Sequence, residues 1–322
     1  MTAAHPATAW TGDGRLERPA RRIVSLLPSA TEIVCALGLE SRLVAVTHEC
    51  DFPADAVAGL TWVTANRLSP EVSRSAEIDA AVRSAMTDGH GIYALDDALL
   101  TDLEPDLILT QELCRVCAVA YPTVLEAARS AGGDGGPMVV SLEPHSIVDV
   151  LATIGHVARL AGVPDAGERL VGDLRRRLAS VERPTKPRRV ALVEWLDPLF
   201  APGHWVPEQV EMAGGTSVIG QAGERSRETT WEALAESRPD VVVLGLCGFD
   251  LSRTLAEWAA FAVPDAFART RACRDGELWA IDGSAYVSRP GPRLVDGVEI
   301  LAAILAGRAD ERAIRLPARA VP

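Results

Sequence analysis

The chain contains the same series of short apolar segments twice, and this repeat constrains its fold more than any single residue. In each series the first segment begins with two arginines, the second carries a Pro-Asp pair, and the third follows a turn that contains glycine. The segments are residues 21–26, 104–110 and 139–142 in the first half, and residues 188–193, 238–244 and 278–281 in the second. Short apolar runs behind a turn are typical of strands buried on both faces of a parallel sheet. The repeat therefore predicts an α/β protein with two Rossmann-like lobes that contain parallel sheets.

The predicted elements divide the chain into two lobes, a connector and two tails. No strand pattern occurs between residues 146 and 182, where apolar side chains recur at helical spacing and Pro164 interrupts or begins a helix. The parts are a flexible N-terminal tail (1–20), an N-terminal α/β lobe (21–145), a long helical connector (146–187), a C-terminal α/β lobe (188–307) and a C-terminal tail (308–322). A cleft between two lobes is a common ligand site, so we expect the ligand there.

Composition and charge restrict the class of partner. The 322-residue chain carries a formal net charge of -12, which argues against a nucleic-acid partner. No apolar run is long enough to cross a bilayer, and residues 1–20 hold neither the apolar stretch of a secretory leader nor a lipoprotein cysteine. These features predict a cytoplasmic protein whose six cysteines remain thiols.

Polar and aromatic side chains that could contact a ligand follow the predicted strands. Ligands of open parallel sheets bind beyond the carboxyl ends of the strands. The predicted ligand-binding residues are Ser29, Glu112 and His145 in the first lobe and Trp195, His204, Trp205, Phe249, Tyr286 and Arg289 in the second. Structural alternatives stay open: a histidine can cap a helix, a tryptophan can fill a core, and Arg289 can form an internal salt bridge.

Four further residues could form a tetrahedral metal site. Cys114 and Cys117 form a C-x2-C pair, and His48 and Cys50 lie two residues apart, so both could point to one side of an extended segment. Together they would supply one imidazole and three thiolates, a ligand set suited to zinc, or to iron. The alternatives are a redox dithiol or small residues buried beneath a loop.

The sequence lacks the motifs of several common enzyme classes. No G-x-S-x-G, Walker A or strand-linked G-x-G-x-x-G motif is present. If the chain catalyses a reaction, Glu49, Glu112 or Glu194 would serve as acid or base beside the Cys/His set.

The chain resembles the periplasmic binding proteins with a helical backbone, the class III solute-binding proteins, and in particular their cobalamin-binding branch. The residues that carry the resemblance are 22–32, Leu37-Gly38 and 104–108. The resemblance covers about residues 21–306. It implies two Rossmann-like lobes joined by a long helix, with cobalamin, another corrinoid or a related metal chelate as the ligand. It also implies contact with an ABC permease through one acidic residue on each lobe, for which Asp97 and Glu232 are the nearest matches.

Three functional hypotheses follow. The first is a cytoplasmic corrinoid-binding protein that performs no bond chemistry and holds its ligand with aromatic faces and hydrogen bonds, with His145 or His204 near the metal. The second is a cytoplasmic metal-dependent or thiol-dependent enzyme on the same scaffold, using His48, Cys50, Cys114 and Cys117. The third is a transport protein that is delivered without a visible leader or comes from a truncated gene start.

Overall fold

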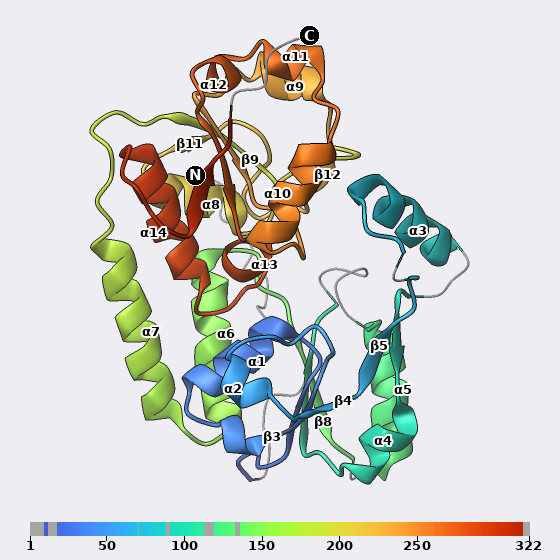
Figure 1. Cartoon of the computed structure of the whole chain (residues 1–322). Helices are drawn as coiled ribbons and strands as arrows, with labels where there is room; N and C mark the ends of the chain where they lie inside the picture. The colour runs from blue at the N-terminus through green and yellow to red at the C-terminus, as the bar shows by residue number, and fades with distance from the viewer. Residues whose placement is uncertain are drawn as a thin grey trace. The chain divides into compact units, whose positions relative to one another are not determined.

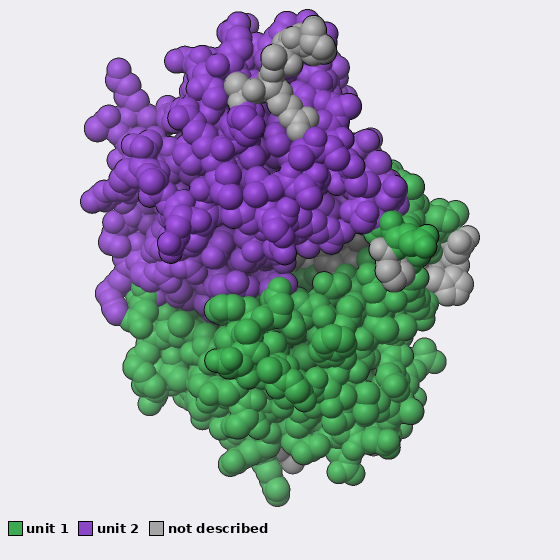
Figure 2. All heavy atoms as spheres, viewed as in Figure 1, with its two compact units in different colours: residues 1–72, 80–173 green, residues 73–79, 174–322 purple. Residues whose placement is uncertain are grey.

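The computed structural model describes residues 10–11, 18–69, 71–87, 91–112, 119–132 and 136–317. Its elements are labelled in Figure 1. They form two compact units, unit 1 with residues 1–72 and 80–173 and unit 2 with residues 73–79 and 174–322 (Figure 2). Strands and helices alternate in both units, which confirms the predicted α/β class.

Unit 1 contains a sheet in the order β1-β8-β7-β2-β3-β4. Its strands are β1 (Trp10–Thr11), β2 (Ile23–Ser25), β3 (Leu43–Val46), β4 (Thr61–Trp62), β7 (Leu107–Thr110) and β8 (Met138–Leu142). All neighbouring pairs are parallel except β1 with β8. The first half of the sequence repeat thus supplies β2, β7 and β8, three adjacent strands of one sheet. A separate antiparallel pair joins β5 (Thr64–Asn66) to β6 (Tyr93–Leu95).

Successive side chains of a strand point to opposite faces of the sheet. The buried strands of unit 1 therefore need helices packed against the sheet. Val24 and Ile108 face a core shared with Leu100 of α4 and Val124 of α5. The elements are α1 (Pro28–Ala36), the 3₁₀ helix η1 (Glu40–Arg42), α2 (Ala54–Val57), α4 (Asp97–Asp102), α5 (Tyr121–Gly132) and α6 (Ile147–Leu160). The Ser146 side chain accepts a hydrogen bond from the backbone N–H of Asp149 and so begins α6.

Two helices contain residues of both units: α3 (Ser75–Thr87) and α7 (Pro164–Ala179). The predicted connector, residues 146–187, comprises α6 and α7, and Pro164 occupies the first position of the second helix. Proline fits that position because its missing N–H would have no partner there.

Unit 2 contains a sheet in the order β11-β9-β13-β14-β15. Its strands are β9 (Arg189–Val193), β11 (Thr216–Ser217), β13 (Val241–Leu244), β14 (Leu278–Ile281) and β15 (Ala313–Arg315). The pairs are parallel except β14 with β15. The short strands β10 (Phe200–Ala201) and β12 (Arg227–Glu228) pair separately. The second half of the repeat thus supplies β9, β13 and β14.

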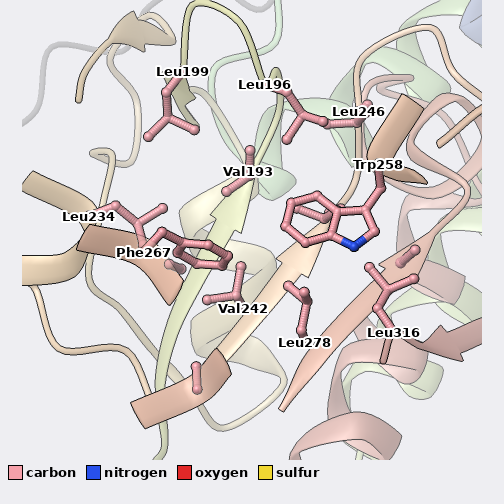
Figure 3. Close-up of a cluster of buried hydrophobic side chains, with 14 of the residues drawn as sticks. Val193, Leu196, Leu199, Leu234, Val242, Leu246, Trp258, Phe267, Leu278 and Leu316 are labelled. Atoms are coloured by element: carbon pink, nitrogen blue, oxygen red, sulfur yellow. The ribbon is translucent and has the colours of Figure 1, made fainter. Parts of the chain in front are cut away.

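The core of unit 2 is rich in aromatic side chains. Trp258 and Phe267 approach the buried residues Val242 and Leu278 of the sheet (Figure 3). The indole of Trp231 packs against Phe267 with ring centroids 4.9 Å apart. The helices of unit 2 are α8 (Val206–Met212), α9 (Trp231–Glu236), α10 (Leu251–Ala260), α11 (Asp265–Ala268), α12 (Arg271–Arg274), α13 (Gly283–Tyr286) and α14 (Leu294–Leu305).

In both units a helix ends just before the repeat segment that carries the Pro-Asp pair, and the first residue of that segment has the same backbone conformation. Glu104 follows α4 with φ 43°, and Arg238 follows α9 with φ 49°. A left-handed residue just after a helix, followed by proline, is a common helix stop. Arg22 donates to the carbonyl oxygens of Leu103 and Glu104. The Pro-Asp motif therefore has a structural role in both units.

Both predicted tails contribute strand residues. Trp10–Thr11 pair with β8, and Ala313–Arg315 pair with β14 as an antiparallel edge strand. Segments of two or three residues are too short to carry a recognisable strand pattern, so their sequence is typical of a tail. Their pairing depends on the neighbouring strand, which lies far away in the sequence.

Candidate functional site

His48 lies just beyond the carboxyl end of β3, within a cluster of polar side chains of unit 1. Its Nδ1 lies 2.7 Å from Thr64 Oγ1, and its ring centroid lies 5.4 Å from that of Tyr93. The Tyr93 hydroxyl donates to Glu49 Oε1 at 3.4 Å, and His48 Nε2 lies 3.4 Å from the same oxygen. Sequence reasoning missed Thr64 and Tyr93, because the pairing of β5 with β6 brings them to His48 from separate parts of the chain.

Cys50 belongs to a different group of contacts. Its Sγ lies 3.1 Å from Thr31 Oγ1, and that hydroxyl donates to Ser25 Oγ at 2.9 Å. The thiol is buried, so these contacts fit the alternative of a small residue beneath a loop. Cys114 and Cys117 lie outside the described residues. Among the residues that the structure describes, no group of three or more His, Cys, Asp or Glu side chains could hold a metal ion.

The other three predicted site residues of unit 1 differ in exposure. Ser29 is buried in the first turn of α1. Glu112 is exposed, and its backbone N–H donates to Glu143 Oε1 at 2.7 Å. Glu143 also accepts a hydrogen bond from the hydroxyl of Ser141. His145 is half-buried, and its backbone N–H donates to Asp149 Oδ2 at 3.0 Å. Glu112 and His145 are thus the more accessible of the three.

Trp195 and Phe249 pack edge to face beyond β9 and β13 in unit 2. Their ring centroids lie 5.2 Å apart, and the Arg253 guanidinium lies 3.8 Å from the centroid of Phe249. Phe249 is only 2% exposed, which favours a core role for it. Trp195 is half-buried, and its Nε1 donates to the carbonyl oxygen of Ser75 at 3.2 Å.

Trp205 and His204 stack on each other where α8 begins. Their ring centroids lie 5.6 Å apart. Trp205 is 5% exposed and donates from Nε1 to the carbonyl oxygen of Val287 at 2.8 Å. A buried indole with a satisfied N–H is typical of a core residue. The structure therefore favours the core alternative for Trp205.

Tyr286 and Arg289 follow β14 and are both half-buried. Burial raises the pKa of Tyr286, so its hydroxyl keeps its proton at neutral pH and can donate a hydrogen bond. Asp282 begins α13 by accepting from the backbone N–H of Ala285 at 2.7 Å. Burial also raises the pKa of Asp282.

Asp97 and Glu232 occupy corresponding places in the two units. Each is exposed and lies in the first turn of a helix, Asp97 in α4 and Glu232 in α9. A side chain caps each helix, Asp96 in unit 1 and Thr230 in unit 2. An acidic residue is favourable there because the N-terminus of a helix carries partial positive charge.

Comparisons with known proteins show that most of the chain is similar to vitamin B12-binding, heme-binding and ABC transporter substrate-binding proteins. No protein-family model matches the chain. The chain is 25% identical over 289 residues to a vitamin B12-binding protein of Vibrio cholerae, covering 87% of both chains. It is 22% identical over 316 residues to an uncharacterized ABC transporter substrate-binding lipoprotein of Bacillus subtilis, covering 94% of this chain and 86% of that protein.

Solved structures show the same relationship. A periplasmic heme-binding protein of Pseudomonas aeruginosa superposes with a TM-score of 0.66 at 25% identity, covering 90% of this chain and 94% of that one. A periplasmic vitamin B12-binding protein of Vibrio cholerae superposes with a TM-score of 0.61 at 23% identity, covering 89% of this chain and 97% of that one.

The fold and these relatives confirm the resemblance found in the sequence: the chain is similar over most of its length to periplasmic solute-binding proteins of the helical-backbone class. Within that class, its homologues belong to the branch of vitamin B12-binding and heme-binding proteins.

The expectation of a cytoplasmic protein is wrong. The relatives are periplasmic proteins or a substrate-binding lipoprotein, which indicates a location outside the cytoplasm. A leader is a delivery signal separate from the fold, so the composition of residues 1–20 was a poor guide to where the binding protein works. Among the described residues, the helices are all too short or too polar to span a membrane.

Proposed function

We propose that this protein binds a corrinoid, with cobalamin as the first ligand to test. The observation that carries the proposal is the 25% identity to a vitamin B12-binding protein across 87% of both chains. The side chains beyond the strands support it. Trp195 and Tyr286 of unit 2 are half-buried aromatic groups, and Trp62 at the edge of the unit 1 sheet is 60% exposed. Such groups can cover the flat face of a macrocycle and donate hydrogen bonds to its substituents.

Heme or an iron chelate is the second class of ligand. Several relatives of known structure are named as heme-binding proteins, including the one from Pseudomonas aeruginosa. Heme differs from cobalamin in its ionised carboxylates, which an arginine can bind with two hydrogen bonds. Arg289 and Arg293, which follow β14 in the sequence, are the arginines that we propose for contact with such a group.

Isothermal titration with cyanocobalamin, hemin and a ferric hydroxamate separates these ligands. We expect cyanocobalamin to bind with a Kd of about 1 μM or tighter, which corresponds to roughly -8 kcal/mol. Trp195→Leu should weaken binding about tenfold, whereas the matched control Trp279→Leu, within strand β14, should leave it unchanged. Tighter binding of hemin would transfer the proposal to heme, and the absence of heat with all three ligands at micromolar concentrations would refute it.

We also propose a permease partner that Asp97 and Glu232 contact. Their exposure and their matching places in the two units support this, since one transporter with two related halves could bind both. Asp97→Lys with Glu232→Lys should abolish ligand uptake by the reconstituted transporter while leaving ligand affinity unchanged. Retained uptake would exclude this contact.

The metal set of His48, Cys50, Cys114 and Cys117 stays a separate proposal. Elemental analysis of the ligand-free protein should find one equivalent of zinc or iron that is lost in Cys114→Ser with Cys117→Ser. If the metal content is the same in this double variant and in the unmodified protein, these cysteines do not hold the metal.

A further inference from the structure

Residues Ser73–Asp79, here called the strap, belong to unit 2, although the chain before and after them belongs to unit 1. They include the first residues of α3 and are coloured with unit 2 in Figure 2. The chain therefore passes between the two units at residues 72/73, 79/80 and 173/174. The predicted connector accounts only for the last of these passages.

Glu257 of α10 anchors the strap through both carboxylate oxygens. Its Oε1 accepts from the backbone N–H of Ser75 at 3.1 Å and from the Ser75 hydroxyl at 2.6 Å. Its Oε2 lies 2.8 Å from Nε of Arg74. Glu257 is 4% exposed and Ser75 is 1% exposed, so the contacts between these two residues are shielded from water.

Three further contacts hold the strap in unit 2. Trp195 Nε1 donates to the carbonyl oxygen of Ser75, and Arg253 donates to that of Ser73, each at 3.2 Å. The side chain of Ile78 packs against the core that contains Trp258 and Phe267. The strap is thus held by an ion pair, hydrogen bonds and apolar packing.

The strap also has internal order that prepares it for docking. Glu77 accepts hydrogen bonds from the backbone N–H groups of Ser73 and Arg74, each at 3.2 Å. These bonds lower the pKa of Glu77, which keeps it ionised and able to hold the turn. The turn presents the Ser75 N–H and hydroxyl together, as two hydrogen bonds to one carboxylate oxygen require.

A carboxylate buried in this way is stable only while its partners remain. Taking an ionised carboxylate out of water is unfavourable unless hydrogen bonds and an opposite charge compensate. The strap supplies all three polar partners described for Glu257, one backbone N–H and two side-chain groups, so the anchor favours a fully docked strap over a partly docked one.

We propose that the strap is a second tether between the two units, and that its anchorage by Glu257 limits how far one unit moves against the other. A single helical connector would allow the units to rock about one point. A second attachment removes part of that freedom, and release of the strap restores it. This inference concerns the chain itself and holds whatever the ligand is.

Glu257→Gln in the full-length, ligand-free protein tests the tether. The amide keeps the shape of the side chain but removes the charge opposite Arg74. We expect amide hydrogen exchange of Ser73–Asp79 to become about tenfold to hundredfold faster, as for the loss of hydrogen bonds to a charged group. The matched control is Glu236→Gln, the same change at an exposed glutamate at the end of α9, which should leave this exchange unchanged.

Movement between the units is measured in the same variants by double electron–electron resonance. Nitroxides attached to unnatural amino acids at exposed Glu126 of α5 and exposed Arg274 of α12 report one distance between the units without using the native cysteines. We expect a broader distance distribution in Glu257→Gln than in Glu236→Gln.

Each outcome decides one part of the proposal. Unchanged exchange in Glu257→Gln would show that Glu257 does not anchor the strap. Faster exchange with an unchanged distance distribution would show that the strap is anchored but does not restrain the units. If Glu257→Gln does not fold, Ser75→Ala removes only the hydroxyl contact and should shift both measurements in the same direction by a smaller amount; the absence of both shifts in that folded variant would overturn the proposal.

Discussion

The first strands of the two units are attached at their amino ends in the same way. In unit 1, Asp106 accepts from the backbone N–H groups of Arg21 and Arg22 at 2.7 and 3.1 Å. In unit 2, Asp240 accepts from the backbone N–H of Arg189 at 3.0 Å. Arg189 also donates to the carbonyl oxygens of Ser237 and Arg238, as Arg22 does to their counterparts in unit 1. The residues that make the repeat recognisable therefore stabilise the fold.

The carboxyl ends of the strands differ between the units. Unit 1 places a polar cluster there, in which His48, Thr64 and Tyr93 contact one another. Unit 2 places aromatic rings there, with Trp195 against Phe249. Ligands of open parallel sheets bind beyond these ends, so the residues proposed for ligand recognition lie where the two units differ. The residues at the amino ends, which are alike in both units, stabilise the fold.

The largest expected effect concerns the aromatic core of unit 2. Phe267→Ala removes a fully buried ring that packs against Trp231 and Trp258, and should lower the free energy of unfolding by about 3–5 kcal/mol. Phe267→Leu keeps most of the volume and should cost less than about 1.5 kcal/mol. Urea denaturation followed by circular dichroism measures both. Equal losses in the two variants would mean that the core requires the aromatic ring itself and not only its volume.

The next effect tests whether the two aspartates are equivalent. Asp106→Asn should cost about 2 kcal/mol because it weakens two hydrogen bonds to a charged acceptor. Asp240→Asn should cost about 1 kcal/mol because one such bond to a backbone N–H is weakened. Asp102→Asn, at the exposed end of α4, is the control and should change stability by less than about 0.5 kcal/mol. A larger loss for Asp240→Asn than for Asp106→Asn would contradict the proposed ranking.

A third effect depends on pH and lies in unit 1. Burial lowers the pKa of His156 in α6 to about 4, from an ordinary value of 6.5. The unfolded chain therefore binds the proton first, so stability should fall as the pH drops from about 6.5 toward 4, by about 1–2 kcal/mol. Thermal unfolding at several pH values should show that His156→Gln removes this loss. His145→Gln should retain it, and an unchanged acid profile in His156→Gln would refute the assignment.

The smallest effect has the opposite sign and lies in unit 2. Burial raises the pKa of Asp282, so the folded state holds the proton more strongly and this group's contribution to stability falls as the pH rises through that range. Asp282→Asn keeps a residue able to cap α13 and should stabilise the protein by up to about 1 kcal/mol at neutral pH. Thermal unfolding at pH 7 and at acid pH measures the difference. A loss of stability at neutral pH would show that the charge of Asp282 is needed.

The sequence was sufficient to predict the strands of the repeat but not the edges of the sheets. The strands β2, β7, β9, β13 and β14 fall within the repeated apolar segments, and β8 extends beyond its segment by one residue, Met138. An interior strand carries a continuous apolar pattern because both of its faces are buried. The edge strand β15 spans only Ala313–Arg315 and depends on pairing with β14. Its sequence alone therefore gives no strand signal.

The candidate site was harder to predict because burial is not a local property. Trp195 and Trp205 both follow predicted strands, yet only Trp195 is accessible while Trp205 bonds to Val287 inside the core. Tryptophan serves cores and ligand sites equally well, so its residue type cannot separate the two roles. The contact between Ser75 and Glu257 joins residues 182 positions apart, and no local pattern predicts it.

The tryptophans give this protein an optical consequence. Trp195, Trp205, Trp231, Trp258 and Trp279 all belong to unit 2, whereas only Trp10 and Trp62 belong to unit 1. Ultraviolet emission from the intact protein therefore reports mainly on one half of the molecule. A coloured macrocycle bound near Trp195 would quench that emission by energy transfer, so binding can be followed without attaching a dye.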